Sequence, residues 1–203
     1  MSSFNFKVIK KQPRSSKYMG FLKIEAYGMP HPSWIFVKTP NQVDKFITRK
    51  AEFGWTVRTC LATDINHLEL NLPFFNHLPP QEVKSKINEI KQKMNRDIYF
   101  VIYPSWEFLK SGNYLLLEET AVIEAIDGFL GELTNGIKNP KVTLTYDRFS
   151  KRLLTTYGDS NFLSQNEILR ILKYNTIIKE DHVTNEWSIT TKNEFYFHHW
   201  IEY

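Results

Sequence analysis

Apolar residues along this chain recur at helical spacing in some segments and form short strand-like runs in others. Helical spacing and capping signals predict a first helix that ends at Gly28, a residue suited to the left-handed backbone after a helix. Thr39, which is followed by a proline at the first helical position, predicts the start of a second helix. The capping-box pair Ser164 and Glu167 predicts the start of the last helix. The predicted helices cover about residues 16–27, 40–53, 80–94 and 165–179.

Short apolar runs bounded by glycine, proline and polar turn residues predict strands, and these dominate the second half of the chain. Helices and strands alternate only in the first half, so the predicted fold class is α+β with two lobes. One predominantly antiparallel sheet is predicted to contain residues 122–126, 142–146, 186–190 and 195–201. The other predicted strands are residues 34–38, 55–60, 97–104, 114–117 and 152–157.

Two connecting segments also receive a prediction. Residues 110–112 are predicted to form a turn, because they have the sequence Lys-Ser-Gly between two apolar runs. Residues 61–78 contain four side chains of metal-ligating type, namely Asp64, His67, Glu69 and His77. Their spacing matches no common metal-binding motif, so we interpret this segment as a polar loop.

The composition is that of a folded globular chain, with 42% hydrophobic and 24% charged residues among 203. No run approaches the roughly 18 apolar residues that a membrane-spanning helix needs, and the first residues do not resemble a secretion signal. The only cysteine, Cys60, cannot form an internal disulfide. We therefore expect a cytoplasmic protein without a membrane partner.

The net charge of +4 is mild, and the densest basic stretch is residues 7–17. Such a stretch suits nucleic acid, but it also suits a solvated leader or a phosphate-binding loop. The 15 Phe, 10 Tyr and 5 Trp residues lie mostly within apolar runs rather than between basic residues, which favours core packing over base stacking. Nucleic acid is therefore the weakest of the partners considered.

A motif of three glycines, a glutamate and a proline occupies the segment from Glu124 to Pro140. This segment resembles the Glu-Ala-x-x-Gly-Leu-Gly-Glu region of the ATP-grasp nucleotide-binding domain in phosphoenolpyruvate synthase and pyruvate phosphate dikinase. Other segments resemble that domain in the same chain order: Lys17 with the turn and strand at residues 28–37, then Thr56-Val-Arg58-Thr, and finally Glu186-Trp187. The resemblance spans about residues 17–203.

This resemblance implies an ATP-grasp-like fold of two lobes, with antiparallel sheets, flanking helices and a nucleotide cleft between the lobes. The lobes are predicted to comprise residues 1–96 and residues 97–203. The implied cofactors are ATP and Mg²⁺. The implied partner is therefore a nucleotide, and a protein partner is considered as well.

The same resemblance implies roles for individual residues. Lys17 and Arg58 would hold the phosphates of ATP, because charged side chains form strong hydrogen bonds to phosphate oxygens. The hinge strand from Tyr99 to Pro104, which contains Tyr103, would offer backbone groups to adenine. Glu186 corresponds to a magnesium ligand of the family, and His199 takes the place of a metal-binding glutamine.

Two departures from the family pattern predict weakened catalysis. Ile201 replaces an arginine that, in the family, neutralises charge on the transferred phosphoryl group, and residues 15–16 replace a double glycine. Lys17, Arg58 and Arg148 are the candidate substitute cations. We expect a nucleotide-binding protein related to phosphoenolpyruvate synthase whose ATP-dependent phosphotransfer is slow or absent. The alternative is a non-catalytic module that binds a nucleotide or a macromolecule with the same fold.

Overall fold

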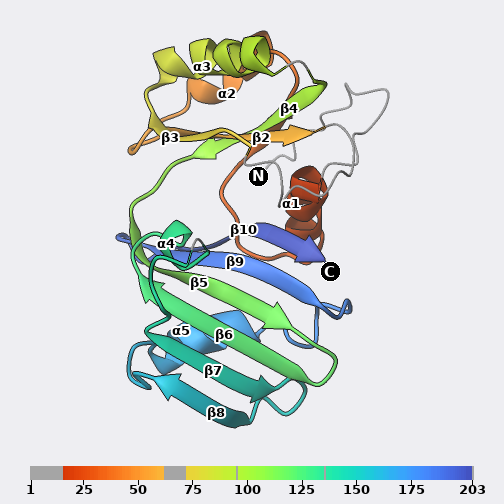
Figure 1. Cartoon of the computed structure of the whole chain (residues 1–203), viewed down its shortest axis with the longest axis vertical. Helices are drawn as coiled ribbons and strands as arrows, with labels where there is room; N and C mark the ends of the chain where they lie inside the picture. The colour runs from red at the N-terminus through yellow and green to blue at the C-terminus, as the bar shows by residue number, and fades with distance from the viewer. Residues whose placement is uncertain (1–15, 62–71, 95, 135, 203) are drawn as a thin grey trace.

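The computed structural model of the chain describes residues 16–61, 72–94, 96–134 and 136–202. Within these residues the strands form two antiparallel sheets, which lie one above the other in Figure 1. The first sheet has the strand order β1-β4-β2-β3, and the second has the order β10-β9-β5-β6-β7-β8. The predicted α+β class with two lobes is confirmed.

The first sheet forms the upper lobe in Figure 1 with helical segments on its outer face. Its central strands β2 and β4 are buried along almost their whole length. Strand β4 is a nearly continuous apolar run, whereas β2 also contains two threonines and an arginine. The apolar stripe of the longest helix, Val83, Ile87 and Ile90, packs into the core on this face. The elements are β1 (Ile35–Val37), η1 (Pro40–Val43), α2 (Asp44–Ile47), β2 (Trp55–Leu61), β3 (Phe74–Leu78), α3 (Pro80–Lys93) and β4 (Ile98–Pro104).

The second sheet forms the lower lobe, and it contains the four segments that were predicted to share one antiparallel sheet. Its core lies between one face of the sheet and the helical segment that follows β8, where alternate strand residues such as Tyr114, Ile123 and Trp187 are buried. The elements are β5 (Phe108–Leu116), β6 (Thr120–Asp127), α4 (Gly131–Thr134), β7 (Val142–Asp147), β8 (Leu153–Gly158), α5 (Gln165–Leu172), β9 (Val183–Thr190) and β10 (Phe195–Glu202).

Helix α1 (Ser16–Ala26) comes first in the chain but packs against β10, the last strand. The ring of Tyr27 stacks on that of Trp200, with centroids 5.6 Å apart. Gly20 allows close contact, since a Cβ there would lie 3.0 Å from the carbonyl oxygen of Trp200. Lys23 and Tyr27 both bond the carboxylate of Glu180. Helix α1 is therefore held by the second sheet, while the predicted division of the chain at residue 96 stays a prediction.

Two of the predicted connections prove to be strands. The predicted turn at residues 110–112 was wrong, because these residues continue β5. Gly112 is needed there for close packing rather than for a turn, since a Cβ would lie 1.8 Å from the carbonyl oxygen of Glu124. The predicted loop at residues 61–78 was wrong for residues 74–78, which form β3. His77 lies in β3, whereas Asp64, His67 and Glu69 lie outside the described residues.

Two predicted helices are shorter than expected, although their start signals are confirmed. After Thr39 the chain forms the 3-10 segment η1 and a single turn, α2, with Oε1 of Gln42 accepting a hydrogen bond from the backbone N–H of Thr39 at 2.8 Å. At α5, the backbone N–H of Ser164 donates to Oε2 of Glu167 at 2.6 Å. Helix α5 then ends at Leu172 instead of continuing to residue 179.

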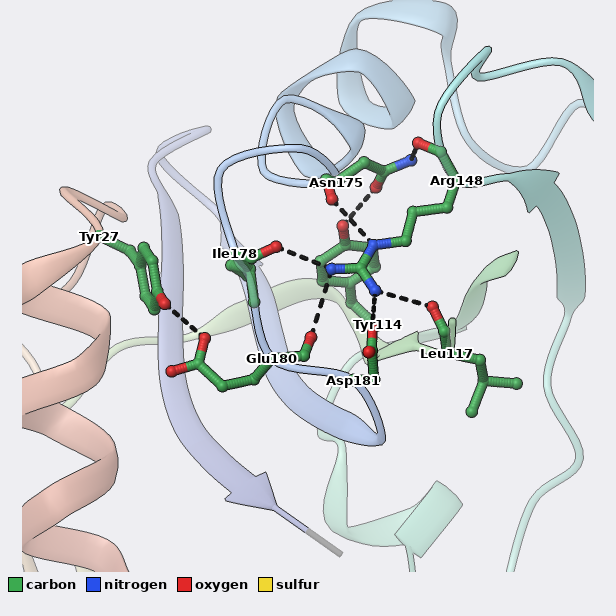
Figure 2. A network of polar contacts seen from close by, with 8 residues as sticks. All are labelled: Tyr27, Tyr114, Leu117, Arg148, Asn175, Ile178, Glu180 and Asp181. Atoms are coloured by element: carbon green, nitrogen blue, oxygen red, sulfur yellow. Dashed lines mark hydrogen bonds and ion pairs between the residues drawn. The ribbon is translucent and has the colours of Figure 1, made fainter. Parts of the chain in front are cut away.

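The segment after α5 wraps around the guanidinium group of Arg148 (Figure 2), which is only 4% exposed. Arg148 donates to the backbone carbonyls of Asn175 (3.0 Å), Leu117 (2.9 Å) and Ile178 (2.7 Å), and it pairs with the carboxylate of Asp181. These bonds satisfy carbonyls that would otherwise be buried without partners. They hold the irregular segment after α5 in place, and the neighbouring Glu180 bonds Lys23 and Tyr27 at the end of α1.

Candidate functional site

The site lies between the two sheets, and the alternation of β2 decides which side chains reach it. Trp55 and Val57 point into the core of the first lobe, so Thr56 and Arg58 face the second sheet. Tyr103 of β4 is the register partner of Thr56 and lies on the same face. From the second sheet, Glu186 of β9 faces them.

These residues line a cavity of about 200 Å³. The first sheet, the linker after β4, the segment before α4 and the second sheet all contribute to its walls. The cavity is smaller than the roughly 300–1,000 Å³ of typical small-molecule sites. The lining residues are Thr56, Arg58, Phe74, Asn76, His77, Tyr103, Ser105, Trp106, Phe108, Phe129, Leu130, Gly131, Glu186 and His198.

A β-bulge in β10 brings two histidines to Glu186. Phe197 pairs with Trp187 and His199 pairs with Glu186, so His198 is an extra residue between the two pairs. Nδ1 of His199 lies 3.1 Å from Oε1 of Glu186, and Nδ1 of His198 lies 3.7 Å from Oε2. The expected placement of Glu186 and His199 on adjacent antiparallel strands is therefore confirmed.

The electrostatics of this end of the cavity keep Glu186 ionised. Burial alone would raise the pKa of its carboxyl group, but His199, His198 and Arg58 outweigh burial and hold the pKa well below its usual range. Burial, together with Arg58 and His199, lowers the pKa of His198 to about 4 despite the attraction of Glu186, so this imidazole is neutral at pH 7. The result is one carboxylate beside one neutral ring.

Arg58 is the cation that faces the cavity. Burial alone would lower the pKa of its guanidinium group, but Tyr103 and Glu186 more than compensate, and the pKa lies above its usual value. The guanidinium lies over the ring of Phe74, 5.3 Å from the centroid. Two residues predicted as site residues, Arg58 and Tyr103, thus line the same cavity as Glu186.

Lys17 lies in a separate small space that it shares with His199, behind Arg58, Tyr103 and His198. Its Nζ donates a hydrogen bond to the backbone carbonyl of Thr59 in β2 at 3.1 Å. Burial, and next the charge of Arg58, lower the pKa of Lys17. The candidate substitute cation Arg148 lies elsewhere, because its guanidinium group is enclosed by the segment after α5.

Sequence reasoning missed the neutral, polar end of the cavity beside the linker after β4. Oγ of Ser105 lies 2.7 Å from Oγ1 of Thr56, which donates to Oδ1 of Asn76 at 3.1 Å. Thr56 could have been found, because it precedes Arg58 by two residues on a predicted strand and therefore shares its face. Asn76 and Ser105 had no comparable signal in the sequence.

The donor set can supply only part of a magnesium site. Glu186 is the only carboxylate among the described residues that line the cavity. In the described part of the chain, no group of three or more His, Cys, Asp or Glu side chains is arranged to hold a metal. Magnesium prefers oxygen ligands and often takes most of them from phosphate and water. Glu186 therefore fits as a single ligand beside a phosphate group, whereas the imidazole of His199 is a poor ligand for this ion.

No family model matches the chain, and no curated protein matches it in sequence. Solved structures do match. D-alanyl-alanine synthetase A from Vibrio cholerae has a TM-score of 0.55 at 10% identity, over 91% of this chain and 54% of that one. The D-alanine-D-alanine ligase from Coxiella burnetii has a TM-score of 0.53 at 10% identity, over 91% and 46%. The chain has an ATP-grasp-like fold.

A third ATP-grasp-like neighbour is the carboxyaminoimidazole ribonucleotide synthase from Aspergillus clavatus, whose structure is complexed with ATP. It has a TM-score of 0.51 at 10% identity, over 91% of this chain and 44% of that one. The chain thus spans about half the length of these enzymes. Identities this low show the fold alone, and the finer resemblance to phosphoenolpyruvate synthase is not shown. None of the described helices has the length and hydropathy required to cross a membrane.

Proposed function

We propose that the chain binds ATP with Mg²⁺ in the cavity between its two sheets. The observation that carries this proposal is that Arg58 and Glu186 line one cavity between the two sheets of an ATP-grasp-like fold. The A. clavatus synthase, with a similar fold, is described in complex with ATP. A guanidinium group can bond two phosphate oxygens at once, and a carboxylate can hold the magnesium ion that accompanies them.

Each residue then has a distinct role. Arg58 holds the phosphates, Tyr103 keeps the guanidinium in place, and Glu186 is the protein ligand of Mg²⁺, with His199 beside it. When bound, Mg²⁺ would neutralise part of the phosphate charge. Lys17 becomes a second phosphate ligand only if its ammonium group leaves the carbonyl of Thr59. The volume of about 200 Å³ agrees with such a movement, because the lobes must separate before a triphosphate can enter.

We further propose that the isolated chain turns over ATP at a rate near background. Ile201 lies on β10, where the phosphoenolpyruvate synthase pattern has an arginine. Arg148 cannot replace that arginine, because its N–H groups are bound within the second lobe. An arginine that stabilises transferred phosphoryl charge can be worth about 10³ in rate. The alternative function is a non-catalytic module that binds a nucleotide or a macromolecule with the same fold.

Titration calorimetry with ATP, in the presence and absence of Mg²⁺, tests the binding proposal. We expect Arg58→Ala to weaken ATP binding by about 1.5–3 kcal/mol, the worth of hydrogen bonds from a charged donor. The matched control is Arg49→Ala, because Arg49 is exposed on the first lobe and lies outside the cavity. Unchanged affinity in Arg58→Ala, or no binding by the wild type, would contradict the proposal.

Phosphate release from ATP by the wild-type chain tests the second part. We expect a rate far below the roughly 1–100 s⁻¹ that is typical of kinases. A rate within that range, abolished by Glu186→Gln, would show that the chain is catalytic and would exclude the binding-module alternative.

A further inference from the structure

A β-bulge in β3 creates the polar end of the cavity. Thr56 of β2 lies opposite both Asn76 and His77, because the register shifts between Trp55 and Val57 and His77 has a φ of 58°. The bulge turns the backbone N–H of His77 toward Ser105, whose Oγ accepts it at 2.9 Å. Ser105 and Thr56 are 5% and 3% exposed, so this bond lies in the interior.

The bond between Thr56 and Asn76 fixes the direction of its neighbour. Oγ1 of Thr56 donates its single proton to Oδ1 of Asn76, so it must accept from Oγ of Ser105. Oγ of Ser105 in turn accepts from the backbone N–H of His77. The amide of Asn76 therefore uses its oxygen within the protein. Its Nδ2 has no partner among the described residues, and both of its N–H groups are available to a ligand.

The surroundings of Asn76 indicate what that ligand is. Phe74, Trp106 and Phe108 line the same cavity, and aromatic rings stack well on nucleobases. Arg58 follows Thr56 by two residues on the same face of β2, about 7 Å away along the strand. A ligand that reaches both Asn76 and Arg58 must carry a neutral hydrogen-bond acceptor and an anionic group a short distance apart, as a nucleotide does.

We propose that Asn76 reads the base of the bound nucleotide by donating from Nδ2 to an unprotonated ring nitrogen or a carbonyl oxygen. This inference rests on the proposed function, because it requires a nucleotide in this cavity. An asparagine that reads adenine with both amide atoms needs its oxygen as well as its nitrogen. Here Thr56 already occupies one acceptor position of the oxygen, whereas both N–H groups of Nδ2 are unused within the described residues. A base that bonds Nδ2 must therefore turn an acceptor toward Asn76.

The test compares ATP with inorganic tripolyphosphate, which carries phosphates without a base. Calorimetry on Asn76→Ala should show ATP affinity lowered by about 3- to 10-fold, the factor expected for one neutral hydrogen bond, with tripolyphosphate affinity unchanged. Asn76→Asp keeps an oxygen that can accept from Thr56, but it replaces the amide donor with an acceptor. The ratio of ATP affinity to tripolyphosphate affinity should therefore fall at least as far in Asn76→Asp as in Asn76→Ala. Asn161→Ala, in the exposed segment before α5, is the matched control.

The outcomes separate this inference from the function on which it rests. If ATP binds and both Asn76 variants keep the wild-type ratio of the two affinities, the base-reading role is overturned and the proposed function stands. If Asn76→Ala weakens ATP and tripolyphosphate equally, Asn76 only shapes the cavity and the inference is again overturned. If the wild type binds neither compound, the proposed function fails and the inference falls with it.

Discussion

Arg58 and Arg148 are both withdrawn from solvent, but their guanidinium groups meet opposite surroundings. Arg148 donates to several backbone carbonyls and pairs with Asp181, all within one lobe (Figure 2). None of the N–H groups of Arg58 bonds a backbone carbonyl in the described part of the chain, and this side chain faces a cavity between the lobes. The difference teaches that burial of a charge alone does not indicate a functional role. The N–H groups of Arg148 are bound within the fold, whereas Arg58 bonds no backbone carbonyl among the described residues and faces a cavity.

The largest effect is expected from Arg148→Met. This change leaves several buried carbonyls and the carboxylate of Asp181 without their partner, and breaking such a buried network costs about 3–5 kcal/mol. Urea unfolding at pH 7 measures the loss, and the exposed Arg152→Met is the matched control. A loss of stability below about 1 kcal/mol would contradict the structural role assigned to Arg148.

A smaller effect is expected at Glu180, which the segment around Arg148 presents to α1. Burial alone would raise the pKa of Glu180, but bonds from Lys23 and Tyr27 lower it to about 2. A carboxylate whose pKa is lowered by folding stabilises the fold at pH values above its pKa in the unfolded chain, which is about 4.3. This stabilisation is lost as the pH falls toward 2.

The pH dependence of unfolding measures this contribution. Because Glu180 is partly exposed, we expect a modest effect. The free energy of unfolding of the wild type should exceed that of Glu180→Gln by about 1 kcal/mol at pH 7, and this difference should disappear as the pH falls to about 2. A difference that stays constant between these pH values would contradict the assigned role of the charge.

The smallest effect on stability is expected from Arg58→Met. Its guanidinium group holds no backbone carbonyl in the described residues, and Glu186 keeps both histidines as neighbours, so the free energy of unfolding should change by less than about 1 kcal/mol. Urea unfolding of this variant, beside calorimetry with ATP, gives the sharpest contrast with Arg148→Met. If Arg58→Met lowers the free energy of unfolding by about 3 kcal/mol or more, Arg58 is as important for stability as Arg148, and the contrast between the two arginines is wrong.

Much of the fold could be predicted from local sequence signals. The capping box at Ser164 and the apolar runs of the second sheet contain enough information in a few adjacent residues to place a helix start and most strands. Gly112 misled the interpretation, because the need for a glycine there comes from the backbone of Glu124 on the neighbouring strand. A contact with a neighbouring strand cannot be predicted from the residues that lie next to the glycine in the sequence.

The candidate site was predicted less completely for the same reason. Arg58, Tyr103, Glu186 and His199 were named from a resemblance, and the structure brings the first three to one cavity. The roles of these four residues and of Lys17 stay predictions. His198 faces Glu186 only because β10 contains a bulge, and Asn76 reaches Thr56 only because β3 contains another. Bulges depend on pairing between strands, which the hydrophobic pattern does not specify.

The docking of α1 on β10 sets an order for folding during synthesis. Residues 16–26 leave the ribosome long before the strand that holds them, which ends at residue 202. The ring of Tyr27 therefore has no Trp200 to stack on until more than 170 further residues have been made. Closing so long a loop is slow, so the first sheet has time to assemble while α1 is still unpaired. Once α1 has docked on β10, Lys17 lies against β2 and shares a small space with His199 of β10.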